Sequence, residues 1–167
     1  MAIRDARRDD FAAILTLNAE SVHFLSPLSP ERLDALHRAA AYHRVVDADG
    51  EIAAFLLAFR EGAAYDSLNY LWFGKHYPAF LYIDRIVVAP SLRGGGLGVE
   101  LYADIAAFAA RSGVPWLTCE FDLEPPNPGS MRFHERMGFR EVGTQWIHGA
   151  TKHVSLQAKA IATAAAG

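Results

Sequence analysis

The fold of this chain is decided by one stretch of sequence, Ile86-Val-Val-Ala-Pro-Ser-Leu-Arg-Gly-Gly-Gly-Leu-Gly98. Apolar residues before Pro90 predict a β-strand, and apolar side chains recur at helical spacing from Gly98 to Ala110. The chain therefore passes from a strand through a glycine-rich turn into a helix. Glycines let backbone N–H groups converge on one point, and the helix adds the positive end of its dipole. The turn predicts a site for an anion such as a pyrophosphate, with a tight turn that binds no ligand as the alternative.

The residues around the turn narrow the choice of anion. A nucleoside-triphosphate loop ends in Gly-Lys-Ser or Gly-Lys-Thr, whereas Gly98 is followed by valine and glutamate. A dinucleotide fingerprint needs glycines at its first, third and sixth positions, and counting from Gly94 or from Gly96 puts a valine or a leucine at the sixth. ATP and NAD are both disfavoured, and the pattern that remains is Arg93-x-x-Gly96-x-Gly98.

Further elements extend the pattern on both sides of the turn. Apolar spacing predicts helices at 11–22, 30–40 and 130–137, and strands at 2–5, 80–89, 115–121, 139–147 and 152–159. Two β runs, 43–47 and 51–60, flank an Asp-Gly pair that supplies the positive φ of a tight hairpin. Residues 61–78 are rich in aromatic side chains without a clear period, which predicts either a loop that caps the core or a lid over a substrate pocket.

A second motif lies further along the chain, Asn127-Pro-Gly-Ser130-Met-Arg-Phe133-His134-Glu-Arg-Met-Gly138-Phe139. Together with the glycine pattern and the order of elements, it resembles the GNAT superfamily of N-acetyltransferases. The strand Tyr82-Ile-Asp-Arg-Ile-Val-Val88 is most similar to bacterial members whose substrates are unassigned. The resemblance implies the α/β (α+β) class, with a single domain over residues 1–159 and a central, mixed and mostly antiparallel sheet with splayed middle strands and flanking helices. Residues 160–167 are expected to form a frayed, alanine-rich tail.

The resemblance also implies acetyl-CoA as a co-substrate and names the residues that hold it. Backbone N–H groups of the turn are expected to bind its pyrophosphate, namely those of Arg93, Gly94, Gly95, Gly96, Leu97 and Gly98. The pantetheine arm is expected to pair with the strand residues Ile86, Val87 and Val88 and to lie beside Asn127, Ser130 and Phe133. For Asn127 and Ser130 the alternative is a local role in capping the short helix.

Acetylation of an amine needs a base, a group that stabilises the oxyanion and an acid for the leaving thiolate. Tyr82 and Asp84 share one face of their strand and match positions where family members carry catalytic bases, so Asp84 is the preferred base. Its alternative role is to anchor an arginine or backbone groups, and Glu120 on the next strand is the competing base. His134 stands where the family usually carries a tyrosine that is proposed to protonate the leaving thiolate. The imidazolium form of His134 would be able to supply this proton. The alternative is that His134 only packs on the cofactor. The resemblance assigns the oxyanion to the backbone N–H of Val88.

Composition limits the classes of partner and the cellular locations expected for the chain. Its 167 residues include 16 Lys and Arg and 19 Asp and Glu, and the net charge of −3 argues against a nucleic-acid partner. One cysteine excludes an internal disulfide and disfavours a zinc site, and no apolar run is long enough to span a bilayer. The charged N-terminus does not resemble a secretory signal. No metal and no membrane partner is expected, and the expected location is cytoplasmic.

We therefore expect an enzyme that moves an acetyl group directly from acetyl-CoA to a primary amine, without a covalent intermediate. Carboxylates and aromatic rings favour a small cationic or aromatic amine over a protein tail. The resemblance places the acceptor site beside the first two helices, and it therefore implies that Asn18, Glu20 and His23 line the acceptor pocket. The alternatives are a non-catalytic CoA-binding or regulatory module and an acyltransferase that uses a longer acyl-CoA. The sequence leaves a homodimer open.

Overall fold

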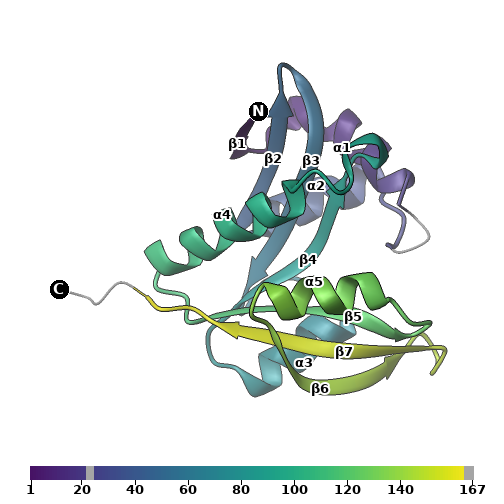
Figure 1. The fold of residues 1–167 in the computed structure, drawn as a ribbon, viewed down its shortest axis with the longest axis vertical. Coiled ribbons are helices and arrows are strands. Elements are labelled where there is room, and N and C mark those ends of the chain that lie inside the picture. Colours follow the sequence, from purple (N-terminus) through teal and green to yellow (C-terminus); the bar gives the residue numbers. More distant parts are fainter. Residues whose placement is uncertain (22–24, 164–167) are drawn as a thin grey trace. The chain divides into compact units, whose positions relative to one another are not determined.

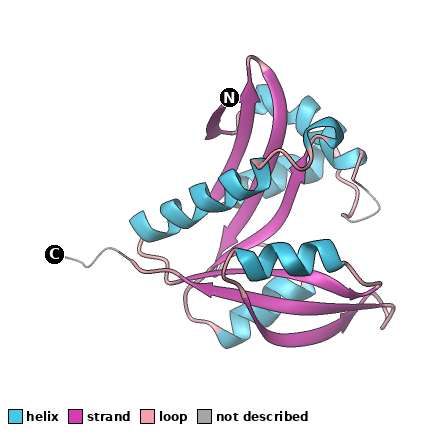
Figure 2. Cartoon of the chain, viewed as in Figure 1, coloured by secondary structure: helices cyan, strands magenta, loops and turns pink. Residues whose placement is uncertain are grey.

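The computed structural model describes residues 1–21 and 25–163 (Figures 1 and 2). Within these residues, the elements follow the expected order with one helix, α3, added between β3 and β4. The strands are β1 (Ala2–Asp5), β2 (Tyr42–Ala48), β3 (Glu51–Arg60), β4 (Leu81–Val88), β5 (Trp116–Glu124), β6 (Arg140–Ile147) and β7 (Lys152–Ala160). The helices are α1 (Phe11–Ala19), α2 (Pro30–Ala39), α3 (Leu68–His76), α4 (Leu97–Arg111) and α5 (Pro128–Arg136), with short 3₁₀ helices η1 (Arg8–Asp10) and η2 (Pro90–Leu92).

The strands form one mixed sheet in the order β1-β2-β3-β4-β5-β7-β6. The pairs β1–β2, β2–β3, β5–β7 and β6–β7 are antiparallel, whereas β4 and β5 are parallel in the register Leu81–Leu117 and Tyr82–Thr118. The α/β class and the mostly antiparallel sheet with flanking helices are therefore confirmed. The chain forms two compact units, a first unit of Met1–Phe59 with Ile83–Ile105 and a second unit of Arg60–Tyr82 with Ala106–Gly167.

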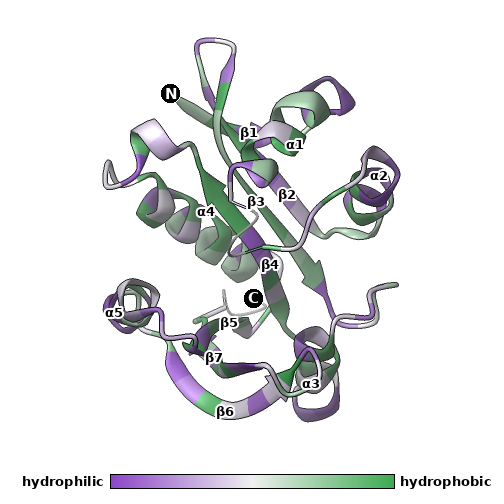
Figure 3. Ribbon diagram, turned by 90° about the vertical axis from the view of Figure 1, so that its right-hand side faces the viewer, coloured by the Kyte–Doolittle hydropathy of each residue, from purple (hydrophilic) through white to green (hydrophobic). Residues whose placement is uncertain are grey.

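In the first unit, helices cover both faces of the strands. Figures 1 and 3 show α1 and α2 on one face of β2 and β3, and the beginning of α4 on the other. The hairpin between β2 and β3 turns at Asp49 and Gly50, whose φ values of 54° and 93° are the positive values that the sequence predicted. The core of this unit includes Ile14 of α1, Leu33 of α2, Val45 of β2, Phe55 of β3 and Val87 of β4, together with Ala6 and Leu17.

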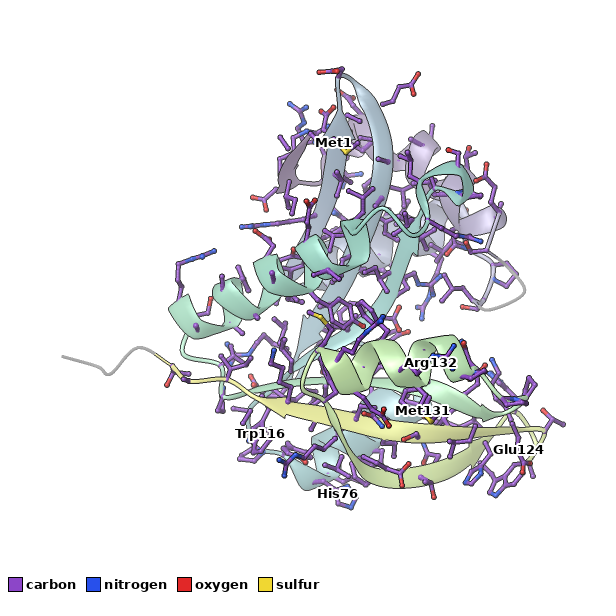
Figure 4. The ribbon with its side chains drawn as sticks, viewed as in Figure 1. Met1, His76, Trp116, Glu124, Met131 and Arg132 are labelled. Atoms are coloured by element: carbon purple, nitrogen blue, oxygen red, sulfur yellow. The ribbon has the colours of Figure 1, made fainter. Side chains whose placement is uncertain are left out.

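In the second unit, α3 and α5 lie on opposite faces of the strands β5, β7 and β6 (Figures 1 and 3). Helix α3 corrects the expectation of a loop at 61–78. Ser67 caps the helix by accepting a hydrogen bond from the Tyr70 backbone N–H, and His76 ends it (Figure 4). The Tyr70 and Phe73 rings are buried against Phe80, at centroid distances of 5.8 and 6.1 Å. The aromatic side chains of this segment therefore contribute to a core.

The position of α3 on the sheet depends on a residue of β6. A Cβ atom on Gly143 would lie 2.6 Å from Trp72 Cζ2, so the indole occupies the space that a side chain at 143 would need. A hydrogen bond of 2.9 Å from Gln145 Nε2 to Asn69 Oδ1 joins the same helix and strand. The added helix is thus fitted closely to β6.

Several element boundaries differ from those expected: β5 ends at Glu124, three residues past the expected end, and α5 begins at Pro128, two residues before the expected start. Helix α1 ends at Ala19, and Val22, the expected end, lies outside the described residues. At the other end of the chain, β7 includes Ala160, and the Ile161 N–H donates to the carbonyl oxygen of Pro115 at 2.8 Å. Strand pairing therefore continues two residues past 159, and residues 164–167 of the expected tail lie outside the described part of the chain.

Candidate active site

The glycine-rich turn adopts a backbone that requires glycine. Gly94 and Gly96 have φ values of 82° and 89°, in the left-handed region that side chains other than glycine rarely adopt. A Cβ atom on Gly95 would lie 3.2 Å from the carbonyl oxygen of Leu92, which is closer than ordinary van der Waals contact. The turn predicted from the sequence is present between η2 and α4, and both conformation and space favour its glycines.

This turn offers backbone groups to an anion. The first N–H groups of an α-helix have no acceptor within the helix, and α4 begins at Leu97, directly after the glycines. The 15 residues of α4 also place the positive end of a helix dipole at the turn. A hydrogen bond of 3.3 Å from the Gly95 N–H to the Leu92 carbonyl helps to hold the loop in shape. Such an arrangement can bind a pyrophosphate through the backbone.

The side chain of Arg93 bonds to other parts of the first unit. Its Nη2 group donates to Ser21 Oγ at 3.0 Å, and its Nε–H donates to the Val88 carbonyl oxygen at 3.4 Å. Ser21 lies just beyond α1, so Arg93 links the glycine-rich turn to the end of that helix. A phosphate contact by the Arg93 side chain would compete with these two bonds.

Asp84 forms an ion pair with its neighbour in sequence. Its Oδ2 accepts from Arg85 Nε at 3.0 Å, and the side chains of Arg85 and Asp84 are only 6% and 7% exposed. The guanidinium also donates to Asn18 Oδ1 at 2.9 Å, and to the carbonyl and hydroxyl oxygens of Ser26, each at 3.1 Å. These contacts match the alternative role of Asp84, which is to anchor an arginine, and its role as a base stays a prediction.

Tyr82 and Glu120, two of the predicted catalytic residues, are hydrogen-bonded to each other. The Tyr82 hydroxyl donates to Glu120 Oε2 at 2.7 Å. The Tyr82 ring is fully buried against Tyr70 and Phe73 of α3, at centroid distances of 5.7 and 5.9 Å. If Glu120 takes up a proton, this bond can persist with its direction reversed, because a carboxylic acid donates and a phenol oxygen accepts. The Asp84–Arg85 ion pair, by contrast, loses its charge pairing when Asp84 is protonated.

The second motif builds the beginning of α5. Asn127 Oδ1 accepts from the Ser130 backbone N–H at 3.2 Å, which is the capping role expected as the alternative for these residues. The Ser130 carbonyl oxygen then accepts from His134 Nδ1 at 2.7 Å. The motif therefore connects Asn127 to His134 through Ser130, and any role beside the pantetheine stays a prediction.

His134 is enclosed by aromatic rings. It is 6% exposed, and its ring centroid lies 5.4–5.5 Å from those of Phe121, Phe133 and Phe139. Burial lowers the pKa of His134, although the hydrogen bond to Ser130 acts in the opposite direction. Because a carbonyl oxygen only accepts, Nδ1 carries the proton of the neutral ring, and Nε2 is then an acceptor. These surroundings disfavour the imidazolium acid expected from the sequence.

Arg85 is the residue that the sequence interpretation missed. The available signal was a charge in a position that strand alternation turns toward the core. Asn18, expected to line an acceptor pocket, is 1% exposed and bonded to Arg85 and Ser26 instead. Glu20 is exposed, and His23 lies outside the described residues.

In the described ranges 1–21 and 25–163, no group of three or more His, Cys, Asp or Glu side chains is arranged to hold a metal ion. In the same ranges, no helix combines the length and the apolar character needed to cross a membrane.

Comparison with known proteins places these features in a family. A family model described as the acetyltransferase (GNAT) family matches residues 2–139, which include the glycine-rich turn and the second motif. The chain belongs to the GNAT acetyltransferase family. It is therefore an acyltransferase, and membership of an enzyme family speaks against the alternative of a non-catalytic module. A search of curated proteins found no match.

Solved structures of GNAT proteins share the fold over nearly the whole chain. The ribosomal-protein-S18-alanine N-acetyltransferase from Escherichia coli is 17% identical, with a TM-score of 0.74 over 99% of this chain and 97% of that chain. Naa20 from Chaetomium thermophilum, in complex with a bisubstrate analogue, is 18% identical, with a TM-score of 0.76 over 96% and 87%. A GNAT acetyltransferase from Streptococcus pneumoniae is 19% identical, with a TM-score of 0.71 over 96% and 98%. At these identities the likeness concerns the fold.

Proposed function

We propose that this GNAT protein transfers the acetyl group of acetyl-CoA directly to a primary amine of a small molecule. The observation that carries the proposal is the glycine-rich turn, in which left-handed Gly94 and Gly96 lead into the N-terminus of α4. Backbone N–H groups and a helix dipole together favour a pyrophosphate, the group that CoA carries. The thioester of acetyl-CoA supplies the activated acyl group. We also propose a cytoplasmic location, because the chain has one cysteine, no long apolar run and a charged N-terminus.

The parts of the cofactor are assigned to separate segments. The backbone of residues 93–98 holds the pyrophosphate, and Ile86, Val87 and Val88 offer strand backbone to the pantetheine arm. The N–H of Val88 serves the oxyanion. In the second unit, Asn127 fixes the start of α5 through Ser130, and the expected roles of Ser130 and Phe133 beside the arm stay predictions.

Glu120 is better supported than Asp84 as the proton acceptor. The Tyr82 hydroxyl orients Glu120 through a bond of 2.7 Å that tolerates a proton on either residue. Asp84 is instead held in a buried ion pair, in which its Oδ2 accepts from Arg85 Nε at 3.0 Å. We assign His134 to packing and to fixing the helix through Ser130.

Calorimetric titration of acetyl-CoA, CoA and NADH tests the cofactor. We expect binding of acetyl-CoA and CoA and none of NADH. Gly96→Ala should weaken acetyl-CoA binding by about tenfold or more, because an L-residue resists the left-handed backbone of the turn. The matched control is Gly113→Ala, since Gly113 has a φ of 70° and equally open surroundings but lies beyond the other end of α4. A folded protein that binds no CoA compound would refute the proposed function.

Release of free thiol from acetyl-CoA tests the acceptor. A panel of spermidine, tyramine, lysine methyl ester and a peptide with a free N-terminal alanine separates small amines from protein-like ones. Faster release with a small amine is the expected result. Acetylation of the peptide alone would overturn the small-molecule part of the proposal, and faster release from propionyl-CoA or succinyl-CoA would favour the longer donor.

A further inference from the structure

Anion binding through the backbone depends on where the start of α4 lies. Leu97, Leu101 and Ile105 follow one another at helical spacing and are 6%, 0% and 0% exposed, so they form the buried stripe of the helix in the first unit. Apolar burial holds a helix against a sheet, but it is not directional. It therefore fixes the position of α4 along and about its own axis less strictly than hydrogen bonds would.

Asp104 of α4 makes such directional contacts with strand β2. Its Oδ2 accepts from the Tyr42 hydroxyl at 2.7 Å and from Arg44 Nη1 at 2.8 Å. Tyr42 and Arg44 are two residues apart on β2, so both lie on the face of the strand that the beginning of α4 covers (Figures 1 and 3). One carboxylate oxygen therefore joins the helix to two side chains of the strand. We call these three residues the α4 anchor.

The two donors of the α4 anchor are themselves held in place. Tyr42 is 2% exposed, and burial, followed by the hydrogen bond to Asp104, raises its pKa, so the phenol keeps its proton and remains a donor. Arg44 Nε donates to Oδ1 of Asp5 on β1 at 3.0 Å, and the guanidinium carbon lies 5.2 Å from the centre of the Tyr42 ring. The anchor therefore connects α4 to β2 directly and to β1 through Arg44.

We propose that the α4 anchor positions the N-terminus of α4 for the pyrophosphate of acetyl-CoA. Asp104 lies about two helical turns after Leu97, where the helix begins. The Glu100 N–H donates to the Gly96 carbonyl at 3.0 Å, so the glycine-rich turn is hydrogen-bonded to the same helix. A shift of α4 at Asp104 therefore moves the N–H groups that face the anion. The inference rests on the proposed function, and the residues of the anchor touch no part of the cofactor themselves.

Asp104→Ala is the test, because alanine removes the carboxylate and keeps a strong helix former at the position. We expect the dissociation constant of acetyl-CoA, measured by calorimetry, to rise about tenfold. Tyr42→Phe removes one of the two hydrogen bonds and should raise the constant about threefold. The double variant should bind no more weakly than Asp104→Ala, because both changes remove one network. Asp104→Asn keeps an oxygen that accepts from Tyr42 and should bind within about twofold of the wild type.

The matched control is Asp34→Ala on α2, the helix on the opposite face of β2 and β3 (Figure 3). The side chains of Asp34 and Asp104 are both 24% exposed, and the Asp34 carboxylate pairs with two arginines, Arg8 and Arg38. The control therefore removes a similar ion pair from another helix of the same unit. Both variants should lower the midpoint of urea unfolding, whereas only Asp104→Ala should weaken acetyl-CoA binding. A loss of stability alone would not produce this difference.

Hydrogen exchange tests the α4 anchor without any cofactor. The Glu100 N–H belongs to the first turn of α4, and the Leu33 N–H, which donates to the Ser29 carbonyl at 2.9 Å, belongs to the first turn of α2. In Asp104→Ala, exchange should accelerate about tenfold at Glu100 and stay unchanged at Leu33. In Asp34→Ala, exchange at Glu100 should stay unchanged.

Unchanged acetyl-CoA affinity in Asp104→Ala, or an equal loss in Asp34→Ala, would overturn the role of the α4 anchor. If Asp104→Ala does not fold, unchanged affinity in Tyr42→Phe would overturn it as well. A folded wild-type protein that binds no CoA compound would refute the proposed function, while exchange at Glu100 would still decide whether the anchor holds the start of α4.

Discussion

Acidification should destabilise the first unit through His43 on β2. This side chain is 7% exposed, and its Nδ1 lies 2.8 Å from Nδ1 of His37 on α2, a contact that needs one nitrogen to donate and the other to accept. Among the described residues, His43 Nε2 has no hydrogen-bond partner. Burial, followed by repulsion from His37, lowers the pKa of His43 to about 4, although the charge of Asp10 acts in the opposite direction.

The size of the effect follows from linkage between protonation and folding. The unfolded chain takes up a proton on His43 near its ordinary pKa of about 6.5, whereas the folded chain does so only near about 4. Between these values the unfolded state binds more protons, so stability falls as the pH falls. The full loss below the lower value is on the order of 3 kcal/mol, and about 2 kcal/mol of it appears between pH 7.5 and pH 5.0.

Urea unfolding at pH 7.5 and pH 5.0 measures this loss. With a typical slope of about 2 kcal/mol per molar urea, the His43 contribution should lower the midpoint by about 1 M at the lower pH. In His43→Leu this part of the pH dependence should disappear. His148→Asn is the matched control, because it removes an exposed histidine at a φ of 53° that asparagine tolerates. Equal pH dependence in the wild type and in His43→Leu would refute the reasoning, and direct NMR titration of the His43 ring decides the matter if the variant does not fold.

Other perturbations test single contacts. Tyr42→Phe removes a buried hydroxyl that donates to Asp104 Oδ2 at 2.7 Å and should cost about 1–2 kcal/mol in chemical unfolding; an unchanged midpoint would contradict this. Tyr82→Phe should lower kcat by about tenfold, because Glu120 loses the hydroxyl that orients it, whereas Tyr70→Phe, in the same ring cluster, should leave kcat unchanged. Glu120→Gln should lower kcat by about a hundredfold or more without changing acetyl-CoA affinity, and a smaller loss than in Asp84→Asn would return the base role to Asp84.

Features with a local cause could be predicted from the sequence. The Asp49-Gly50 hairpin and the glycine-rich turn depend on backbone conformations that few residue types adopt, so a short stretch of sequence is enough to predict them. The Asn127 cap is equally local, because donor and acceptor are three residues apart. The resemblance to the GNAT superfamily rested on these same short motifs, and the family model confirmed it.

Features with distant causes could not be predicted in this way. Helix α3 was missed because its apolar residues show no clear helical stripe, and its Tyr70 and Phe73 are buried by contacts with Phe80 and Tyr82 that the local sequence does not specify. The ranking of Asp84 above Glu120 rested on the position of Asp84 in its strand and on the match of that position to catalytic bases in the family. The contacts that weigh against it are those of Arg85 with Asn18, 67 residues away along the chain, and such a pairing leaves no periodic signal.

The contact of Trp72 with the backbone at Gly143 implies that the helix and the strand are inherited together. Glycine within a strand is unfavourable by about 0.5–1 kcal/mol relative to alanine, so selection has reason to keep it only while the indole lies above it. Relatives that carry a tryptophan-bearing helix between β3 and β4 should keep glycine at this point of β6. Relatives without the helix should place branched or aromatic residues there. Pairwise covariation between the positions of Trp72 and Gly143 would show that the helix and the glycine were gained together.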